Sequence, residues 1–151
     1  MIQRTIIVLV MLFGAFTLQS LLKPEKCSGD EEYKVGLSKL GEFRLLKDYR
    51  VSLKSGSTRS QPMVSYPLSL TDGLTYKFIP INNSDNKGKM IIQIYMSDKR
   101  EMLLASSYNE SSKRHYPAIE FNCGHSGTYE IVFTFIHGEK GCGVGMFAVG
   151  K

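Results

Sequence analysis

Apolar and polar side chains alternate along this chain from Tyr49 onward, and this two-residue period constrains the fold more than any other feature. Tyr49, Val51 and Leu53 are separated by basic or hydroxyl side chains. Successive side chains of a β-strand point to opposite faces, so this segment is predicted to be a strand with one buried face. The same pattern predicts strands at 64–70, 74–78, 90–96, 102–107, 118–123, 128–136 and 144–149.

Turn-forming residues separate these predicted strands. Asp72 and Gly73 form one turn signal, and the segment 82–88 is rich in Asn, Asp and Gly. Strands that recur roughly every ten residues with turns between them are typical of an antiparallel sandwich or barrel. No long amphipathic helix intervenes, which argues against an α/β fold. We therefore predict an all-β fold, an antiparallel β-sandwich, over residues 47–151, with the nearly apolar segment 90–96 as a central strand.

Residues 1–22 differ from the rest of the chain. A short head with one positive charge precedes an apolar stretch over residues 5–18. This stretch is short for a membrane span, which needs about 20 residues, and it fits a secretory signal peptide. A clean Ala-x-Ala cleavage site is missing, so an uncleaved anchor helix is the alternative. Either interpretation places the remaining chain outside the cytoplasm, as a periplasmic, secreted or outward-facing anchored protein.

Residues 23–46 are predicted to form a linker and a short N-terminal element. Leu37 and Leu40 hint at a short helix, but Gly36 and Gly41 argue against a long one.

Three cysteines, Cys27, Cys123 and Cys142, leave the disulfide pairing open. One pair is expected to be bridged in an oxidising compartment. A strand over 127–135 would span about 30 Å at about 3.3 Å per residue, whereas bridged Cα atoms lie within about 7 Å. A Cys123–Cys142 bridge therefore needs the preceding strand to run back alongside. A bridge from Cys27 to either cysteine is at least as plausible, and it leaves one thiol free.

Three segments of the second half of the chain carry a resemblance to a known family. They are Tyr66–Phe78 (YPLSLTDGLTYKF), Leu103–Ser107 (LLASS) and Gly127–Val132 (GTYEIV). Together they resemble bacterial pre-peptidase C-terminal-type domains, here as a stand-alone exported version like small uncharacterised proteins of Bacteroidetes-type bacteria. The resemblance implies a jelly-roll-like sandwich that serves as an accessory module beside secreted enzymes. Met90–Tyr95 stands where that family often carries an aspartate-bearing strand, so no ion site is carried over.

Short motifs in this sequence resemble catalytic or cofactor-binding motifs, but they lack the spacing or the neighbouring elements that those motifs need. Gly143–Ala148 matches a dinucleotide fingerprint, but that motif needs a following helix. Gly124–Gly127 lacks the Gly-x-Ser-x-Gly spacing of a nucleophile elbow. His115, His125 and His137 lie in three different predicted loops. We therefore predict no catalytic residue, no metal site and no cofactor.

Most aromatic residues fall on the predicted inward faces, and two tyrosines are the exceptions. Tyr108 and Tyr116 flank a polar loop that contains Lys113 and Arg114. These four residues are the predicted ligand-binding residues, with the two tyrosines as exposed aromatic contacts.

These observations favour an exported, non-enzymatic binding or accessory module. The net charge of +5 is scattered, without a run of five like charges, so nucleic acid is not the expected partner. A protein or polysaccharide of the cell envelope is expected instead, and the membrane only if the N-terminal helix is uncleaved.

Three alternatives stay open. A carbohydrate-binding module predicts an exposed row of tyrosines on one sheet. A small hydrolase predicts that His125 or His137 meets a carboxylate or the free cysteine in a pocket. An envelope structural component would be held by the N-terminal helix.

Overall fold

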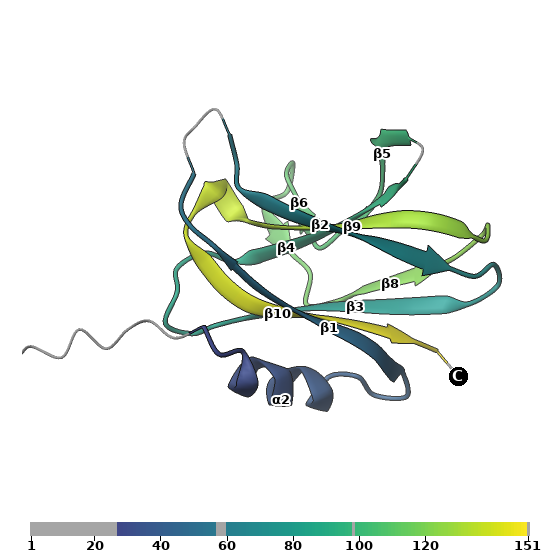
Figure 1. Cartoon of the computed structure of the whole chain (residues 1–151), viewed down its shortest axis with the longest axis horizontal. Helices are drawn as coiled ribbons and strands as arrows, with labels where there is room; N and C mark the ends of the chain where they lie inside the picture. The colour runs from purple at the N-terminus through teal and green to yellow at the C-terminus, as the bar shows by residue number, and fades with distance from the viewer. Residues whose placement is uncertain (1–26, 57–59, 98, 151) are drawn as a thin grey trace, which may run out of the picture.

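The computed structural model describes residues 27–56, 60–97 and 99–150, with only the backbone described at 99–101. The predicted signal or anchor helix at residues 1–22 lies outside the described residues. Two four-stranded antiparallel sheets pack face to face, which confirms the predicted β-sandwich (Figure 1). The elements are α2 (Asp30–Ser38), β1 (Arg44–Leu53), β2 (Met63–Leu70), β3 (Thr75–Asn82), β4 (Met90–Met96), β5 (Lys99–Ser106), β6 (Tyr108–Asn109), β7 (Arg114–His115), β8 (Ile119–Asn122), β9 (Gly127–Phe135), a 3-10 turn (Ile136–Gly138) and β10 (Gly141–Val149).

Most connections between strands cross from one sheet to the other. The first sheet has the order β1-β10-β3-β8 and the second has the order β2-β9-β4-β5. The turn predicted at Asp72-Gly73 carries the chain from β2 in the second sheet to β3 in the first, with Gly73 in the left-handed region at φ 78°. The predicted central position of the segment 90–96 is confirmed, because β4 lies between β9 and β5.

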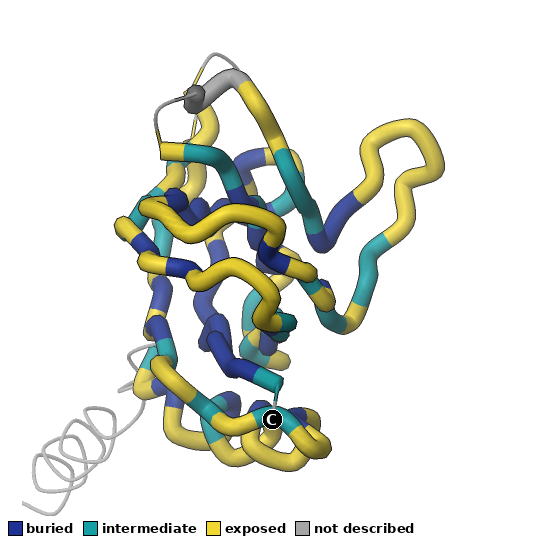
Figure 2. Tube along the Cα trace, turned by 90° about the vertical axis from the view of Figure 1, so that its right-hand side faces the viewer, coloured by how far each residue is buried: buried dark blue, intermediate teal, exposed yellow. Residues whose placement is uncertain are grey.

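The main core lies between the two sheets and follows the predicted alternation. Phe78, Ile92, Ile94, Ile131 and Phe133 are completely buried there. Figure 2 shows the buried residues gathered along the inner strands. The inward positions predicted from the sequence are buried or half-buried: Tyr49, Val51, Leu53, Val64, Tyr66, Leu68, Leu70, Tyr76 and Phe78. Leu74 differs, because it belongs to the turn before β3 and is exposed.

A second apolar layer lies between helix α2 and the outer face of the first sheet. Ile79, Ile81, Val144, Met146 and Ala148 point to this side and are buried with Leu40 and half-buried Tyr33 and Phe43. Gly36 of α2 lies directly on Met146, so the helix approaches the sheet closely. Both faces of β10 are therefore covered, which explains why this strand is buried along its whole length. Figure 1 shows α2 beneath the first sheet.

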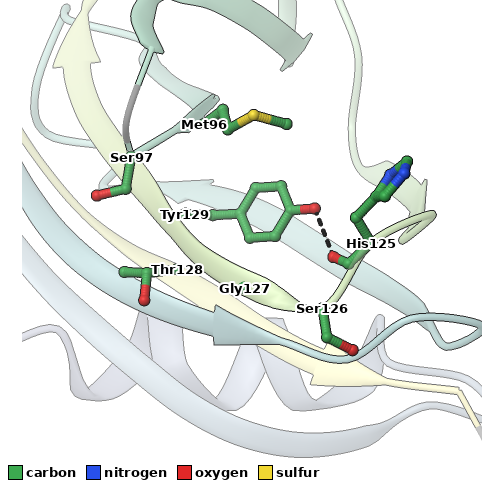
Figure 3. Close-up of a pocket in the computed structure, with 7 residues that line it drawn as sticks. All are labelled: Met96, Ser97, His125, Ser126, Gly127, Thr128 and Tyr129. Carbon is green, nitrogen blue, oxygen red and sulfur yellow. Dashed lines mark hydrogen bonds between the residues drawn. The ribbon is translucent and has the colours of Figure 1, made fainter.

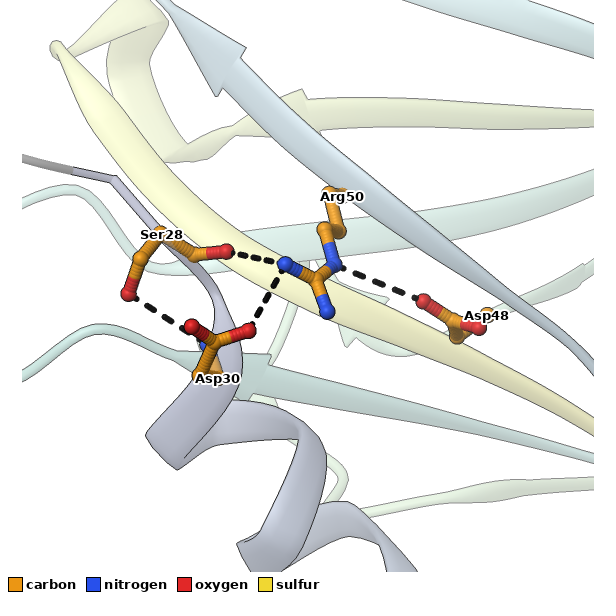
Figure 4. Close-up of polar contacts among 4 residues, drawn as sticks. All are labelled: Ser28, Asp30, Asp48 and Arg50. Atoms are coloured by element: carbon orange, nitrogen blue, oxygen red, sulfur yellow. Dashed lines mark hydrogen bonds and ion pairs between the residues drawn. The ribbon is translucent and has the colours of Figure 1, made fainter.

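A disulfide joins Cys27 to Cys142, with Cα atoms 5.9 Å apart, and Cys123 is a buried free thiol. The bridge ties the segment before α2 to the second residue of β10. Arg50 of β1 holds the same segment through an ion pair with Asp30 at 2.8 Å and a hydrogen bond to the carbonyl oxygen of Ser28 (Figure 4). No helix in the described part of the chain combines the length and the apolar character needed to cross a membrane.

Candidate functional site

The two outer faces of the sandwich differ in what covers them. Helix α2 covers the outer face of the first sheet. Over the second sheet, the residues that the structure describes place no helix. The outer face of the second sheet is hereafter called the open face. The strand register shows which side chains lie side by side on it. Val132 lies between Ser65 and Gln93, and Glu130 lies beside Tyr95. At these positions the open face combines apolar and neutral polar side chains with the carboxylate of Glu130.

Two adjacent cavities mark the open face. The first, of about 220 Å³, lies over β2, β9 and β4 and is lined by Met63, Ser65, Tyr95 and Glu130. The second, of about 380 Å³, is hereafter the hairpin cavity. Its residues come from the strands and from the segment after β5, and they include Gln61, Ile91, Gln93, Tyr108, Tyr116 and Thr134. Gln93 lines both cavities, so they are direct neighbours on the open face.

The segment 108–115, predicted as a polar loop, is a small hairpin formed by β6 and β7. Tyr108 pairs with His115 and Asn109 pairs with Arg114. The expectation of an exposed Tyr108 is wrong, because only 6% of its surface is exposed. Its ring packs against that of His115 at an interplanar angle of 40°, with centroids 4.5 Å apart. The polar run that follows Tyr108 indicates a loop, but the cross-strand pairing turns the tyrosine inward.

The other predicted binding residues lie around the same hairpin. Lys113 is exposed, takes a left-handed backbone conformation at φ 55° and pairs with Glu110 at 3.1 Å. The hydrogen bond to Glu110 is the main cause that raises the pKa of Lys113. Arg114 is exposed and lies over the ring of Tyr116, 5.2 Å from its centroid. Tyr108 and Tyr116 thus reach one cavity, while the two basic residues stand at the exposed hairpin tip.

Hydrogen bonds fix the hairpin on the sheet. The Ser106 hydroxyl donates to the carbonyl oxygen of Tyr108 at 2.9 Å and accepts from its backbone N–H at 3.1 Å. The completely buried Ser107 accepts from the Ile92 N–H through its hydroxyl at 2.9 Å, and its carbonyl accepts from the Tyr116 N–H at 2.8 Å. The wall of the hairpin cavity is therefore anchored to β4.

Sequence reasoning missed the floor of this cavity. Ile91 and Thr134 are both buried although they lie on the outer side of the second sheet, and Gln93 is half-buried beside them. The Thr134 hydroxyl donates to the carbonyl oxygen of Pro62 at 2.9 Å. These residues belong to different strands and share no local motif. Only the pairing of β4 with β9, which places Ile91 opposite Thr134, could have brought them together.

A larger cavity, of about 510 Å³, lies at one end of the sandwich next to His125 (Figure 3). The Tyr129 hydroxyl and the Cys123 thiol both donate to the backbone carbonyl of His125, at 2.8 and 3.1 Å. Burial, followed by the hydrogen bond with Cys123, raises the pKa of Tyr129 to about 12. The His125 ring points away from Tyr129, as Figure 3 shows. The thiol therefore bonds to the backbone of His125 and not to its imidazole, in contrast to what a cysteine–histidine site requires.

The remaining histidines do not join this site. His137 is exposed in the turn after β9, whereas His125 precedes β9, so a whole strand separates them. His115 lies in the hairpin, where burial is the main cause that lowers its pKa and Lys89 contributes. Across the described ranges, no three His, Cys, Asp or Glu side chains come together to hold a metal ion.

The tyrosines do not form the exposed row that a carbohydrate-binding platform would need. Four are buried and four are half-buried, and none of the eight is exposed. The inward faces and the hairpin pairing account for the buried ones: Tyr49, Tyr76, Tyr108 and Tyr129.

Among solved structures, this chain is similar in fold to a lysozyme inhibitor. PliG, a periplasmic inhibitor of g-type lysozyme from Aeromonas hydrophila, aligns with a TM-score of 0.51 over 68% of this chain and 84% of that chain, at 10% sequence identity. The two proteins share a fold. Comparisons with protein-family models and with curated proteins give no match. The resemblance to pre-peptidase C-terminal-type domains stays a prediction.

Proposed function

We propose that this protein is an exported, non-enzymatic binding protein that docks a lysozyme on its open face. The observation that carries the proposal is the likeness to PliG, which covers most of that inhibitor's chain. The disulfide supports export, because such bridges persist in oxidising compartments. The strand orders β1-β10-β3-β8 and β2-β9-β4-β5 support the jelly-roll-like form of the sandwich.

The open face has the composition of a protein-docking surface. Met63 is 63% exposed and Leu103 is 47% exposed, and buried Val132 lies between β2 and β4. Exposed apolar side chains that gather on one face, with polar groups around them, mark interaction sites. Burial and the nearby Glu130 carboxylate raise the pKa of Tyr95 further above neutrality, and its phenol can donate a hydrogen bond to a partner.

The test is inhibition of purified g-type and c-type lysozymes by the purified exported protein, measured as the rate of bacterial cell lysis and by calorimetry. We expect saturable inhibition of the g-type enzyme. Met63→Asp places a charge in the apolar part of the face and should weaken binding by about thirtyfold or more, the effect of losing an interface hot spot. Leu74→Asp is the matched control, because Leu74 is also exposed but belongs to the turn before β3.

Absence of binding to both lysozymes at micromolar concentrations would overturn the proposal. If Met63→Asp and Leu74→Asp weaken lysozyme binding equally, the open face is not the docking surface.

A further inference from the structure

Tyr108 is a buried residue whose hydroxyl group the fold itself does not use. Only 6% of the residue is exposed, and it lines the hairpin cavity. In the described part of the chain, its hydroxyl makes no hydrogen bond to another protein group. The hydroxyl is not among the side-chain atoms that are both sealed from the surface and unpartnered, so it is accessible from the surface. Buried tyrosine hydroxyls normally have a partner, so this one is available to a ligand.

Further uncommitted polar groups line the same cavity. The side-chain amides of Gln61 and Gln93 and the hydroxyls of Ser111 and Tyr116 make no hydrogen bonds within the described residues. Amides and hydroxyls both donate and accept hydrogen bonds. By contrast, the hydroxyls of Ser106 and Thr134 are already bonded to backbone carbonyls. The available groups therefore match a ligand that presents donors and acceptors close together.

The charged side chains of the hairpin are already engaged in local contacts. Lys113 is paired with Glu110 at 3.1 Å, and the Arg114 guanidinium lies over the Tyr116 ring. A charged ligand would have to compete with these contacts, whereas a neutral one would not. Ile91 adds a buried apolar patch to the floor.

From this combination we propose that the hairpin cavity binds a neutral carbohydrate. Sugar hydroxyls donate and accept as the uncommitted amides and phenols do, and the C–H face of a sugar ring suits the apolar floor. The volume of about 380 Å³ is at the small end of ligand pockets, which measure roughly 300–1,000 Å³, so one or two sugar rings fit. This recessed site differs from an exposed tyrosine platform. It goes beyond the proposed lysozyme docking, on which it does not depend.

The experiment titrates the purified exported protein with maltotriose, cellotriose and triacetylchitotriose, followed by NMR chemical shifts and calorimetry. We expect saturable binding of at least one of these neutral probes. Tyr108→Phe keeps the ring and its contact with His115 but removes the hydroxyl, and should weaken that binding about five- to tenfold, as the loss of one hydrogen bond does. Tyr33→Phe is the matched control, since half-buried Tyr33 lies on α2 at the opposite face, and should bind as the wild type does.

Three outcomes would overturn the inference: no saturable binding of any neutral probe, unchanged binding by Tyr108→Phe, or tighter binding of an acidic hexuronate tetrasaccharide than of the neutral probes. Lysozyme inhibition by Tyr108→Phe is measured in parallel. Because the docking test uses Met63 and this one uses Tyr108, either proposal can fail while the other holds.

Discussion

Gly145 shows how a single residue sets the approach of one sheet to the other. A Cβ atom at this position would lie 2.2 Å from a ring carbon of Phe133, which is completely buried and also packs against Tyr49 and Tyr66. The Phe133 ring has little room to move, because aromatic rings surround it.

Gly145→Ala is therefore expected to lower the free energy of unfolding by about 1–3 kcal/mol, as overpacked core substitutions do. Urea denaturation checks this value. Gly124→Ala is the matched control, since a Cβ there would meet nothing within 4 Å, and it should stay within about 0.5 kcal/mol of the wild type. Equal losses for the two variants would contradict the steric argument.

His115 links stability to pH. Its Nε2 atom is buried and has no hydrogen-bond partner among the described residues, and burial with Lys89 nearby lowers its pKa below the ordinary value of 6.5. As the pH falls through 6.5, the unfolded chain takes up the proton before the folded protein does, so stability decreases toward the lower folded pKa.

We expect the free energy of unfolding, measured between pH 7.5 and 5.5, to fall less steeply in His115→Asn than in the wild type. Ser112→Asn changes an exposed residue of the same hairpin without removing a titratable group, and should keep the wild-type slope. If His115→Asn also keeps that slope, the assignment to His115 is wrong.

At the scale of single residues, sequence patterns predict exposure only where the strand register is already known. The alternation of apolar and polar residues around Tyr49 and Tyr76 is sufficient to predict that both residues are buried. Tyr108 stands before a run of polar residues that hides its pairing with His115. The Cys27–Cys142 pairing likewise depends on where α2 brings the N-terminal segment, which no local pattern encodes.

Among the elements, α2 and β1 show what periodicity cannot resolve. The helix covers Asp30–Ser38, and it buries Gly36 while leaving Leu37 40% exposed. Close approach to Met146, and not an apolar stripe, determines which side faces the sheet. The strand β1 begins at Arg44, but a register shift between Leu45 and Lys47 interrupts its alternation.

The disulfide is expected to stabilise the attachment of this N-terminal element. It closes a loop with a sequence separation of 115 residues, and removing a native bridge typically costs about 2–5 kcal/mol. Cys27→Ser/Cys142→Ser should therefore unfold at clearly lower urea concentration than the oxidised wild type.

The comparison for this element is Asp30→Asn, which breaks only the ion pair with Arg50. Both partners of that pair are about half exposed or more, at 49% and 64%, so its loss should cost no more than about 1 kcal/mol. A double serine variant as stable as the oxidised wild type would show that the bridge does not stabilise the fold.

For the whole molecule, the sequence was sufficient to predict a sandwich but not which surface stays open. The strand β10 is buried along its whole length because α2 covers one side and the second sheet covers the other. The sequence of β10 alone indicates neither contact. The hairpin cavity gathers Gln61, Gln93 and Tyr116 from separate segments, so it appears only once the strand order is known.

Protection from hydrogen exchange should follow this arrangement. Inner strands β10, β3, β9 and β4 are bonded on both sides, so their amides are expected to exchange last, through global unfolding. The strands β6 and β7 pair with each other at only two positions, and the exposed turn between them should exchange orders of magnitude faster. Mass spectrometry of deuterium uptake measures both, and equal protection would contradict the assignment of the hairpin as the least stable element.

The bridge at Cys142 also determines how mechanical load enters the protein. Cys142 belongs to β10, which is hydrogen-bonded to β1 on one side and β3 on the other. Tension applied to the polypeptide ahead of Cys27 passes through the sulfur atoms into this middle strand. The force is then borne by two hydrogen-bonded ladders, and α2 is shielded from being peeled away.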